Sequence, residues 1–274
     1  MKLKRGLLDL IIASFFWGTI GIDVEYFSRF GANSFQVVFV RGLIAGLLGL
    51  LTSRSVRNNL LKKDLILMGV LTITSFYEVY IFTIGVIGAD LAAVLLYTAP
   101  IWVLIFGYFL NMESISVKKS LAILLTFIGV YLISDTPTFT LFSLGLGLAS
   151  GLLYALTIIH SKYLQNKGYD NVSIVSVTTL WSTPLTLIIA LIIDIKFTIY
   201  SVESGVYLGI VASFLAYIFF YRGLKYVEPS IATVASALEP VFTIILAYPI
   251  LHEFMTEKEL IGSILIIISI FLAS

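Results

Sequence analysis

The sequence predicts an all-α polytopic membrane protein, with ten transmembrane helices that form two inverted five-helix repeats. Three observations predict this fold: the composition, the spacing of the apolar segments and a repeat at a displacement of 140 residues. Of the 274 residues, 59% are apolar, 12% are charged and none is cysteine. Soluble proteins carry about 25% charged residues, so this composition excludes an ordinary soluble enzyme, a disordered chain and a disulfide scaffold.

Ten apolar segments account for most of the chain. A membrane helix needs about 20 residues to cross about 30 Å of hydrocarbon, so ten of them leave only short loops and no separate water-soluble domain. In chain order, the expected spans lie near 7–27, 34–52, 65–85, 89–110, 118–134, 143–161, 172–193, 205–221, 230–250 and 259–273.

The basic residues between these spans predict the orientation of the chain. With the amino terminus in the cytoplasm, thirteen lysine and arginine residues fall on the cytoplasmic side and three on the other. The cytoplasmic ones are Lys2, Lys4, Arg5, Arg54, Arg57, Lys62, Lys63, Lys118, Lys119, Lys162, Lys167, Arg222 and Lys225. The opposite side has Arg29, Lys196 and Lys258, and Arg41 lies within a span. Cytoplasmic loops are enriched in these residues, which predicts a multi-pass protein of the plasma membrane with both termini in the cytoplasm.

The second half of the chain repeats the first. A displacement of 140 residues superimposes Gly69 on Gly209, Tyr77 on Tyr217, Pro100 on Pro240 and Glu113 on Glu253. We therefore expect two repeats, at 1–135 and 143–274. Because five spans are an odd number of crossings, the two copies must have opposite orientations in the membrane. Inverted repeats are common in secondary transporters, whose substrate sites lie near the membrane midplane between the halves.

Several short motifs resemble those of a known transporter family. In the second half they are Phe220–Val227, Ala232–Leu238, Glu239-Pro240-Val241, Glu253 and Ile261-Gly262. In the first half they are Phe16-Trp17-Gly18, Arg41 before a helix of small residues, and Pro100 with Glu113. Together they resemble the EamA branch of the drug/metabolite transporter superfamily. The resemblance implies a ten-helix carrier of small polar or amphipathic metabolites, often exporting amino acids, in which helices 1–4 and 6–9 surround a central cavity and 5 and 10 are peripheral. The sequence departs from the repeat pattern at Ser269, where the first copy has Gly129.

Ionisable residues at membrane depth are the first candidates for a binding site, because they are costly there and usually face a cavity or a partner. Asp23 and Glu25 lie near the outer end of the first span, where we expect them to reach the headgroups. Arg41 and Glu78 lie at similar depths and have opposite charges. Two interpretations remain open for them: a structural ion pair, or a site in which Arg41 receives a substrate carboxylate while Glu78 or Asp23 neutralises it when the site is empty.

Glu239 is the strongest candidate, because it lies near the middle of the span at 230–250. Pro240 comes directly after it and removes a backbone donor, so we expect a kink there, and another at Pro100. Irregular backbone at this depth is tolerated only against protein or a water-filled cavity. We therefore expect Glu239 to exchange a proton for substrate or to hold a cationic group, unless it is a protonated acid bonded to a neighbouring helix.

Helical spacing adds small, hydroxyl and aromatic residues that suit an amphipathic cavity but also suit close helix packing. On the third span, Thr74, Ser75, Glu78 and Phe82 are expected to share one face. The complete set of substrate-binding candidates is Trp17, Arg41, Tyr77, Glu78, Tyr97, Tyr154, Tyr217, Tyr221, Ser236 and Glu239.

The predicted function is secondary active transport of amino acids or related amphipathic compounds, with export favoured. Transport of organic cations is an alternative, in which Glu78 or Glu239 supplies the negative charge and Trp17, Tyr77 and Tyr217 attract the cation by cation–π contacts. An integral-membrane enzyme acting on lipids is a lesser alternative. No P-loop, metal-binding motif or basic nucleic-acid patch is present, so we expect no enzymatic activity, cofactor, metal or nucleic-acid partner. The expected partners are a small-molecule substrate, the lipid bilayer and a coupling proton, and a homodimer is compatible with this prediction.

Overall fold

The computed structural model describes residues 2–134, 140–252 and 254–273, and every element in these ranges is helical. Eight helical segments are long and apolar enough to cross a membrane. They are α1 (Lys2–Ser28), α2 (Ser34–Thr52), Lys63–Ile87, Ala89–Phe109, α9 (Leu141–Asn166), α10 (Asn171–Ile193), Ile199–Leu224 and Pro229–Ile250. Two further apolar helices, α8 (Val117–Ile133) and α15 (Glu257–Ala273), have 17 residues each, and α3 (Arg54–Asn59) is a short connection.

Four of the eight long segments are interrupted. Lys63–Ile87 contains α4 (Lys63–Leu67), the π-helix η1 (Met68–Ile73) and α5 (Thr74–Ile87). Ile199–Leu224 contains α11 (Ile199–Leu208), the π-helix η2 (Gly209–Leu215) and α12 (Ala216–Leu224). Ala89–Phe109 divides into α6 (Ala89–Leu96) and α7 (Ala99–Phe109), and the last segment into α13 (Pro229–Ser236) and α14 (Leu238–Leu251).

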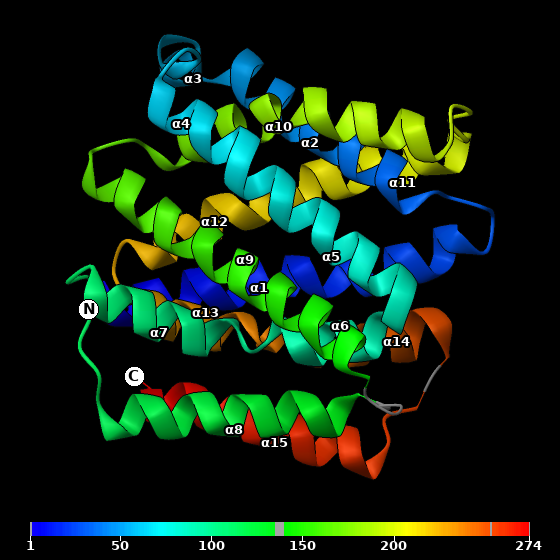
Figure 1. Cartoon of the computed structure of the whole chain (residues 1–274). Coiled ribbons are helices and arrows are strands. Elements are labelled where there is room, and N and C mark those ends of the chain that lie inside the picture. Colours follow the sequence, from blue (N-terminus) through cyan, green and yellow to red (C-terminus); the bar gives the residue numbers. More distant parts are fainter. Residues whose placement is uncertain (1, 135–139, 253, 274) are drawn as a thin grey trace.

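The helices form one bundle, in which α1 begins and α15 ends at the same end (Figure 1). We call this the terminal end. The connections α2–α4, α7–α8, α9–α10 and α12–α13 also lie there, whereas the connections α1–α2, α5–α6 and α10–α11 lie at the opposite end (Figure 1). α8 and α15 pack against each other along one side of the bundle, and α2 packs against α10.

The bounds of several elements recur after 140 residues. α6 and α13 correspond residue for residue, as do α8 and α15. The π-helices η1 and η2 also lie at nearly equivalent positions, and each contains one glycine of the pair Gly69 and Gly209. A Cβ atom at Gly69 would lie 2.4 Å from the carbonyl oxygen of Thr178 on α10, and one at Gly209 would lie 3.0 Å from that of Arg41 on α2. The missing side chains therefore let both π-helices approach a neighbouring backbone closely.

Two of the four interruptions come just before the prolines Pro100 and Pro240. Pro100 comes after the break at Tyr97 and Thr98, and Pro240 comes after the break at Ala237. In the first turn of a helix the missing N–H of proline costs no intrahelical hydrogen bond. The carbonyl groups freed at the second break have other donors: Ser14 Oγ lies 3.1 Å from the Ala235 oxygen, and Tyr97 OH lies 3.2 Å from the Ser236 oxygen.

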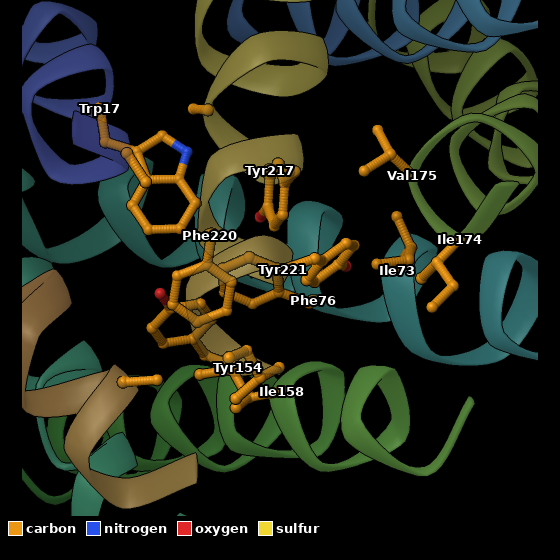
Figure 2. Close-up of a cluster of buried hydrophobic side chains, with 14 of the residues drawn as sticks. Trp17, Ile73, Phe76, Tyr154, Ile158, Ile174, Val175, Tyr217, Phe220 and Tyr221 are labelled. Atoms are coloured by element: carbon orange, nitrogen blue, oxygen red, sulfur yellow. The ribbon is translucent and has the colours of Figure 1, made fainter. Parts of the chain in front are cut away.

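Buried aromatic side chains gather where α1, α5, α9 and α12 meet (Figure 2). We call the following residues the aromatic cluster: Trp17, Phe76, Tyr154, Tyr217, Phe220 and Tyr221. The Trp17 ring lies 5.1 Å from the rings of both Tyr217 and Phe220, and its Nε1 donates to the carbonyl oxygen of Ala212 at 2.9 Å. Phe76 stacks on Tyr154 with a centroid distance of 5.1 Å. These contacts connect α1 with α12 and α5 with α9, and the hydroxyl groups of Tyr77 and Tyr217, 3.4 Å apart, join the two pairs.

Candidate functional site

A cavity of about 460 Å³ lies among α1, α2, α5, α6, α9, α12 and α14, and the aromatic cluster forms its bottom. Its volume is within the usual range for small-molecule sites, about 300–1,000 Å³. The lining reaches residues at the helix ends that lie opposite the terminal end, namely Ser28, Ser34, Asp90, Ser134 and Glu259. We call this the mouth of the cavity. The inner part is lined by the aromatic residues Trp17, Phe76, Tyr77, Tyr80, Tyr97, Tyr154 and Tyr217.

Arg41 brings a positive charge to the cavity wall. Its Nε donates to Ser213 Oγ at 2.9 Å, and its guanidinium carbon lies 5.0 Å from the centre of the Tyr77 ring. Within the described residues, neither terminal nitrogen of this guanidinium has a protein hydrogen-bond acceptor. The arrangement holds the side chain in place and leaves its two terminal groups available to a planar anion such as a carboxylate.

Arg41 and Glu78 do not form an ion pair, so the predicted structural pair is wrong, and so is the neutralisation of Arg41 by Glu78. Among the described residues, no ion pair joins them, and neither carboxylate oxygen of Glu78 has a hydrogen-bond partner. The cavity face of α5 contains Tyr77, Tyr80 and Ile84 instead. One residue along a helix turns the side chain by about 100°, which directs Glu78 away from the cavity.

Asp23 and Glu239 are in electrostatic contact with Arg41. The expectation that Asp23 reaches the headgroups is wrong: its side chain is buried and accepts a hydrogen bond from Ser204 Oγ on α11. The reason is that α1 continues to Ser28, so Asp23 lies more than one turn from its end. Glu25 lies on the exposed face of α1 and pairs with Arg29.

Glu239 lies directly after the second helix break, on the cavity wall. Tyr97 OH is 3.2 Å from Glu239 Oε2 and 3.2 Å from the backbone oxygen of Ser236. Tyr97, at the break between α6 and α7, therefore forms hydrogen bonds with residues on both sides of the break between α13 and α14. Tyr80 and Tyr154 are also in electrostatic contact with this carboxylate. The Glu239 carboxylate therefore lies among tyrosine side chains, and Arg41 lines the same cavity.

The cavity brings together most of the predicted site residues. Trp17, Arg41, Tyr77, Tyr97, Tyr154, Tyr217, Glu239 and Pro240 line it. Glu78, Tyr221, Ser236 and Pro100 do not. Tyr221 lies in the aromatic cluster, where Ser161 Oγ donates to its hydroxyl oxygen at 2.9 Å. The Ser236 hydroxyl donates to the Thr233 oxygen at 2.7 Å within its own helix, so this residue contributes its carbonyl group to Tyr97 instead.

The sequence interpretation missed several lining residues. Phe76, Tyr80 and Ile84 extend the face of Tyr77 on α5, and Asp90 and Glu259 add two acids at the mouth. A search at three- and four-residue intervals from Tyr77 finds Tyr80 and Ile84. The acids at the mouth have no such signal, because their positions depend on how the helix ends meet. Within the described ranges, no group of three or more histidine, aspartate or glutamate side chains is arranged to hold a metal ion.

Comparisons with known proteins match nearly the whole chain to membrane transporters. The model of the EamA-like transporter family matches residues 4–135 and again 141–274. A protein of Archaeoglobus fulgidus described as an uncharacterized transporter is 26% identical over 99% of this chain and 97% of its own length. An uncharacterized transporter of Clostridium kluyveri is 24% identical over 97% and 92%, respectively. A solved crystal structure with 15% sequence identity has the same fold, with a TM-score of 0.85 over 99% of this chain and 96% of the other.

Proposed function

Because the chain belongs to the EamA-like transporter family, we propose that it is a secondary active transporter that exports amino acids or related amphipathic metabolites across the plasma membrane. One observation carries this proposal: Arg41 and Glu239 line the same cavity and interact electrostatically. An amino acid carries one charge of each sign. Its carboxylate fits the free terminal nitrogens of Arg41, and its ammonium group fits Glu239.

Alternating access of two inverted five-helix repeats is part of the proposal, with both termini in the cytoplasm. The element bounds that recur after 140 residues support it. So does the contact between the equivalent hydroxyl groups of Tyr77 and Tyr217, which are 3.4 Å apart. The ten helices of this arrangement include α8 and α15, whose 17 residues are at the lower limit of about 17–25 for a membrane span.

Glu239 is the group that we propose to couple transport to protons. A charged carboxylate in the middle of a membrane helix is unfavourable by roughly 2.5–3.5 kcal/mol on insertion scales. When the site is empty, a proton on Glu239 removes this cost. When a cationic group arrives, the carboxylate can release the proton and bind the ligand, which makes substrate and proton compete for one site.

Organic cations are the second candidate class of substrate. Glu239 and Glu259 line the cavity, against one base, Arg41, among the residues that the structure describes. The aromatic wall of Trp17, Tyr77 and Tyr217 adds cation–π attraction of roughly 0.5–2 kcal/mol per contact. This surplus of negative charge favours a cation without a carboxylate.

A thermal-shift screen of the purified protein distinguishes the two classes. A ligand that binds the folded state raises the apparent melting temperature. We expect amino acids to do so in the wild type and not in Arg41→Ala, while Glu203→Gln, a change at an exposed residue of α11, serves as the matched control. Stabilisation by choline-like amines alone, retained in Arg41→Ala, would favour the organic-cation alternative. Stabilisation only by sugars or nucleosides would contradict both.

A further inference from the structure

A buried polar cluster closes the bundle at its terminal end, far from the mouth. Glu113, in the connection between α7 and α8, has no exposed side-chain surface. Its Oε1 accepts from the Ser230 backbone N–H at 3.2 Å, and its Oε2 accepts from the Ser230 hydroxyl. Neither residue lines the cavity. The proposed substrate site does not use this carboxylate, so the cluster requires a separate explanation.

The connection after α7 is built to place Glu113 against α13. Asn111 has a left-handed backbone with φ of 54°, and the N–H groups of Met112 and Glu113 donate back to the Gly107 oxygen at 2.8 and 3.3 Å. The Glu113 side chain then crosses over Gly107. A Cβ atom at position 107 would lie 2.4 Å from Glu113 Oε1, so the path exists only because this residue is glycine.

Glu113 serves as the cap of another helix. α13 begins with Pro229 and Ser230, and its own N-cap residue Glu228 makes no side-chain capping bond. The first N–H groups of a helix have no intrahelical partner and carry partial positive charge, so an anion at this position is stabilising. Here the anion comes from the α7–α8 connection. The bond therefore joins the two segments that contain the helix breaks beside the substrate site.

Charged residues from three other elements surround this bond. Lys119 of α8 lies 3.7 Å from Glu113 and also pairs with Glu228. Lys162 of α9 donates to the oxygens of Leu224 and Val227 at 2.6 and 3.2 Å, and it is in electrostatic contact with Glu113 and Glu228. The cluster thus fastens the α7–α8 connection, the α12–α13 connection and α9 to one another.

We propose that Glu113 is a latch, whose bonds to Ser230 keep the terminal end closed and must break before the cavity opens there. This inference rests on the proposed alternating access, in which a cavity open at the mouth must later open at the other end. α13 leads from the latch directly to the break at Ala237 and to Glu239. When the bonds between Glu113 and Ser230 break, α13, the half-helix before the proposed substrate site, is therefore free to move.

The latch also responds to protons. Burial raises the pKa of Glu113 to about 6, against the lowering effects of the Ser230 hydrogen bond and of Lys119. When the latch opens, water reaches Glu113 and its pKa returns toward the ordinary 4.5, so the closed state binds a proton more tightly than the open state. Acidification of the terminal side therefore favours the closed latch, and Glu113→Gln imitates the protonated form.

Cysteine labelling tests the latch directly, because the chain has no native cysteine. Ala93→Cys places a single thiol on the cavity wall. An impermeant thiol reagent should label it from the mouth side only, in sided membrane vesicles. Adding Glu113→Ala should raise labelling from the terminal side by at least about tenfold, the change that about 1.4 kcal/mol produces. Ser230→Ala and Gly107→Ala, which displaces Glu113, should act in the same direction, whereas Glu203→Gln should not.

A cooperative melting transition of the purified protein, at a temperature close to that of the wild type, reports whether each variant is folded. If Glu113→Ala fails to fold, Ser230→Ala and Gly107→Ala decide the question. If folded variants are labelled from the terminal side no more than the wild type, the latch proposal is wrong. Because labelling requires no substrate, that result would leave the transport proposal intact. Conversely, failure of every ligand in the thermal-shift screen would count against the proposed substrates and not against the latch.

Discussion

The hydroxyl groups of Tyr77 and Tyr217, which occupy equivalent positions 140 residues apart, lie 3.4 Å from each other at the bottom of the cavity. Arg41 lies over the ring of Tyr77, and Trp17 packs against the edge of Tyr217. The two tyrosines therefore join α5 and α12 at the point where the cavity meets the aromatic cluster.

Removing either of these hydroxyl groups should have the same effect. We expect Tyr77→Phe and Tyr217→Phe each to destabilise the protein by about 0.5–1.5 kcal/mol, the usual net value of one hydrogen bond. The double variant should be less destabilised than the sum, because the two changes remove one shared bond. Unfolding of all four proteins in the same detergent measures this coupling. Additive effects would show that the contact at 3.4 Å contributes nothing.

Glu239→Gln should fold normally and lose either transport or its dependence on pH. Glutamine has the shape of the acid and still accepts the bond from Tyr97 OH, but it cannot release a proton. Flux into proteoliposomes, measured across a range of pH, tests this expectation, with Glu203→Gln as the control. Wild-type flux with an unchanged pH profile would exclude Glu239 as the coupling group.

Arg41→Ala and Glu78→Gln should act independently on stability, because the two side chains do not pair. We expect the free-energy changes of unfolding to add within about 0.5 kcal/mol. A true buried pair behaves differently, since loss of one partner alone typically costs about 3–5 kcal/mol. If the double variant is clearly less destabilised than the sum of the two single variants, the result would support an ion pair between Arg41 and Glu78. If Arg41→Ala is stable but binds no amino acid, its role as the carboxylate receptor gains support.

The raised pKa of Glu113 predicts how stability changes with pH. Its value of about 6 in the folded protein lies above the ordinary 4.5, so the folded state binds the proton more tightly than the unfolded state. The resulting stabilisation is complete below about pH 4.5 and is lost as the pH rises through about 6. The difference corresponds to about 2 kcal/mol. Melting of wild type and Glu113→Gln across this range should show the effect in the wild type only, and equal slopes would contradict it.

Positions 113 and 253 should face opposite sides of the membrane. This expectation comes from the inverted repeat and from the distribution of basic residues, and position 253 lies outside the residues that the structure describes. A single cysteine at position 114, an exposed neighbour of the buried Glu113, and one at position 253 should react with an impermeant reagent from the cytoplasmic and external sides, respectively. Reaction of position 253 from the cytoplasm would contradict the predicted topology.

The sequence predicts the helical segments well, because span length and hydropathy are local properties. It is less informative about which face of a helix meets the cavity. For Glu78 the depth in the membrane is readable, but the rotation of α5 depends on packing and on η1, where a π-turn accommodates an extra residue and rotates the rest of the helix. The depth of Asp23 is not readable, because helix ends are uncertain by a few residues. Glu239 is readable from sequence because its signal, an acid before proline in an apolar span, requires no knowledge of rotation.

The 17 residues of α8 and α15 have a further consequence for the surrounding lipid. At the helical rise of about 1.5 Å per residue, each covers about 26 Å, whereas α1 with its 27 residues covers about 40 Å. In the proposed ten-helix arrangement, α8 and α15 also cross the bilayer, so the long helices have to tilt while the α8–α15 pair has to stand upright or draw the two leaflets together. That arrangement gives the protein a thin side and a thick side, and a change in acyl-chain length strains the two sides in opposite directions.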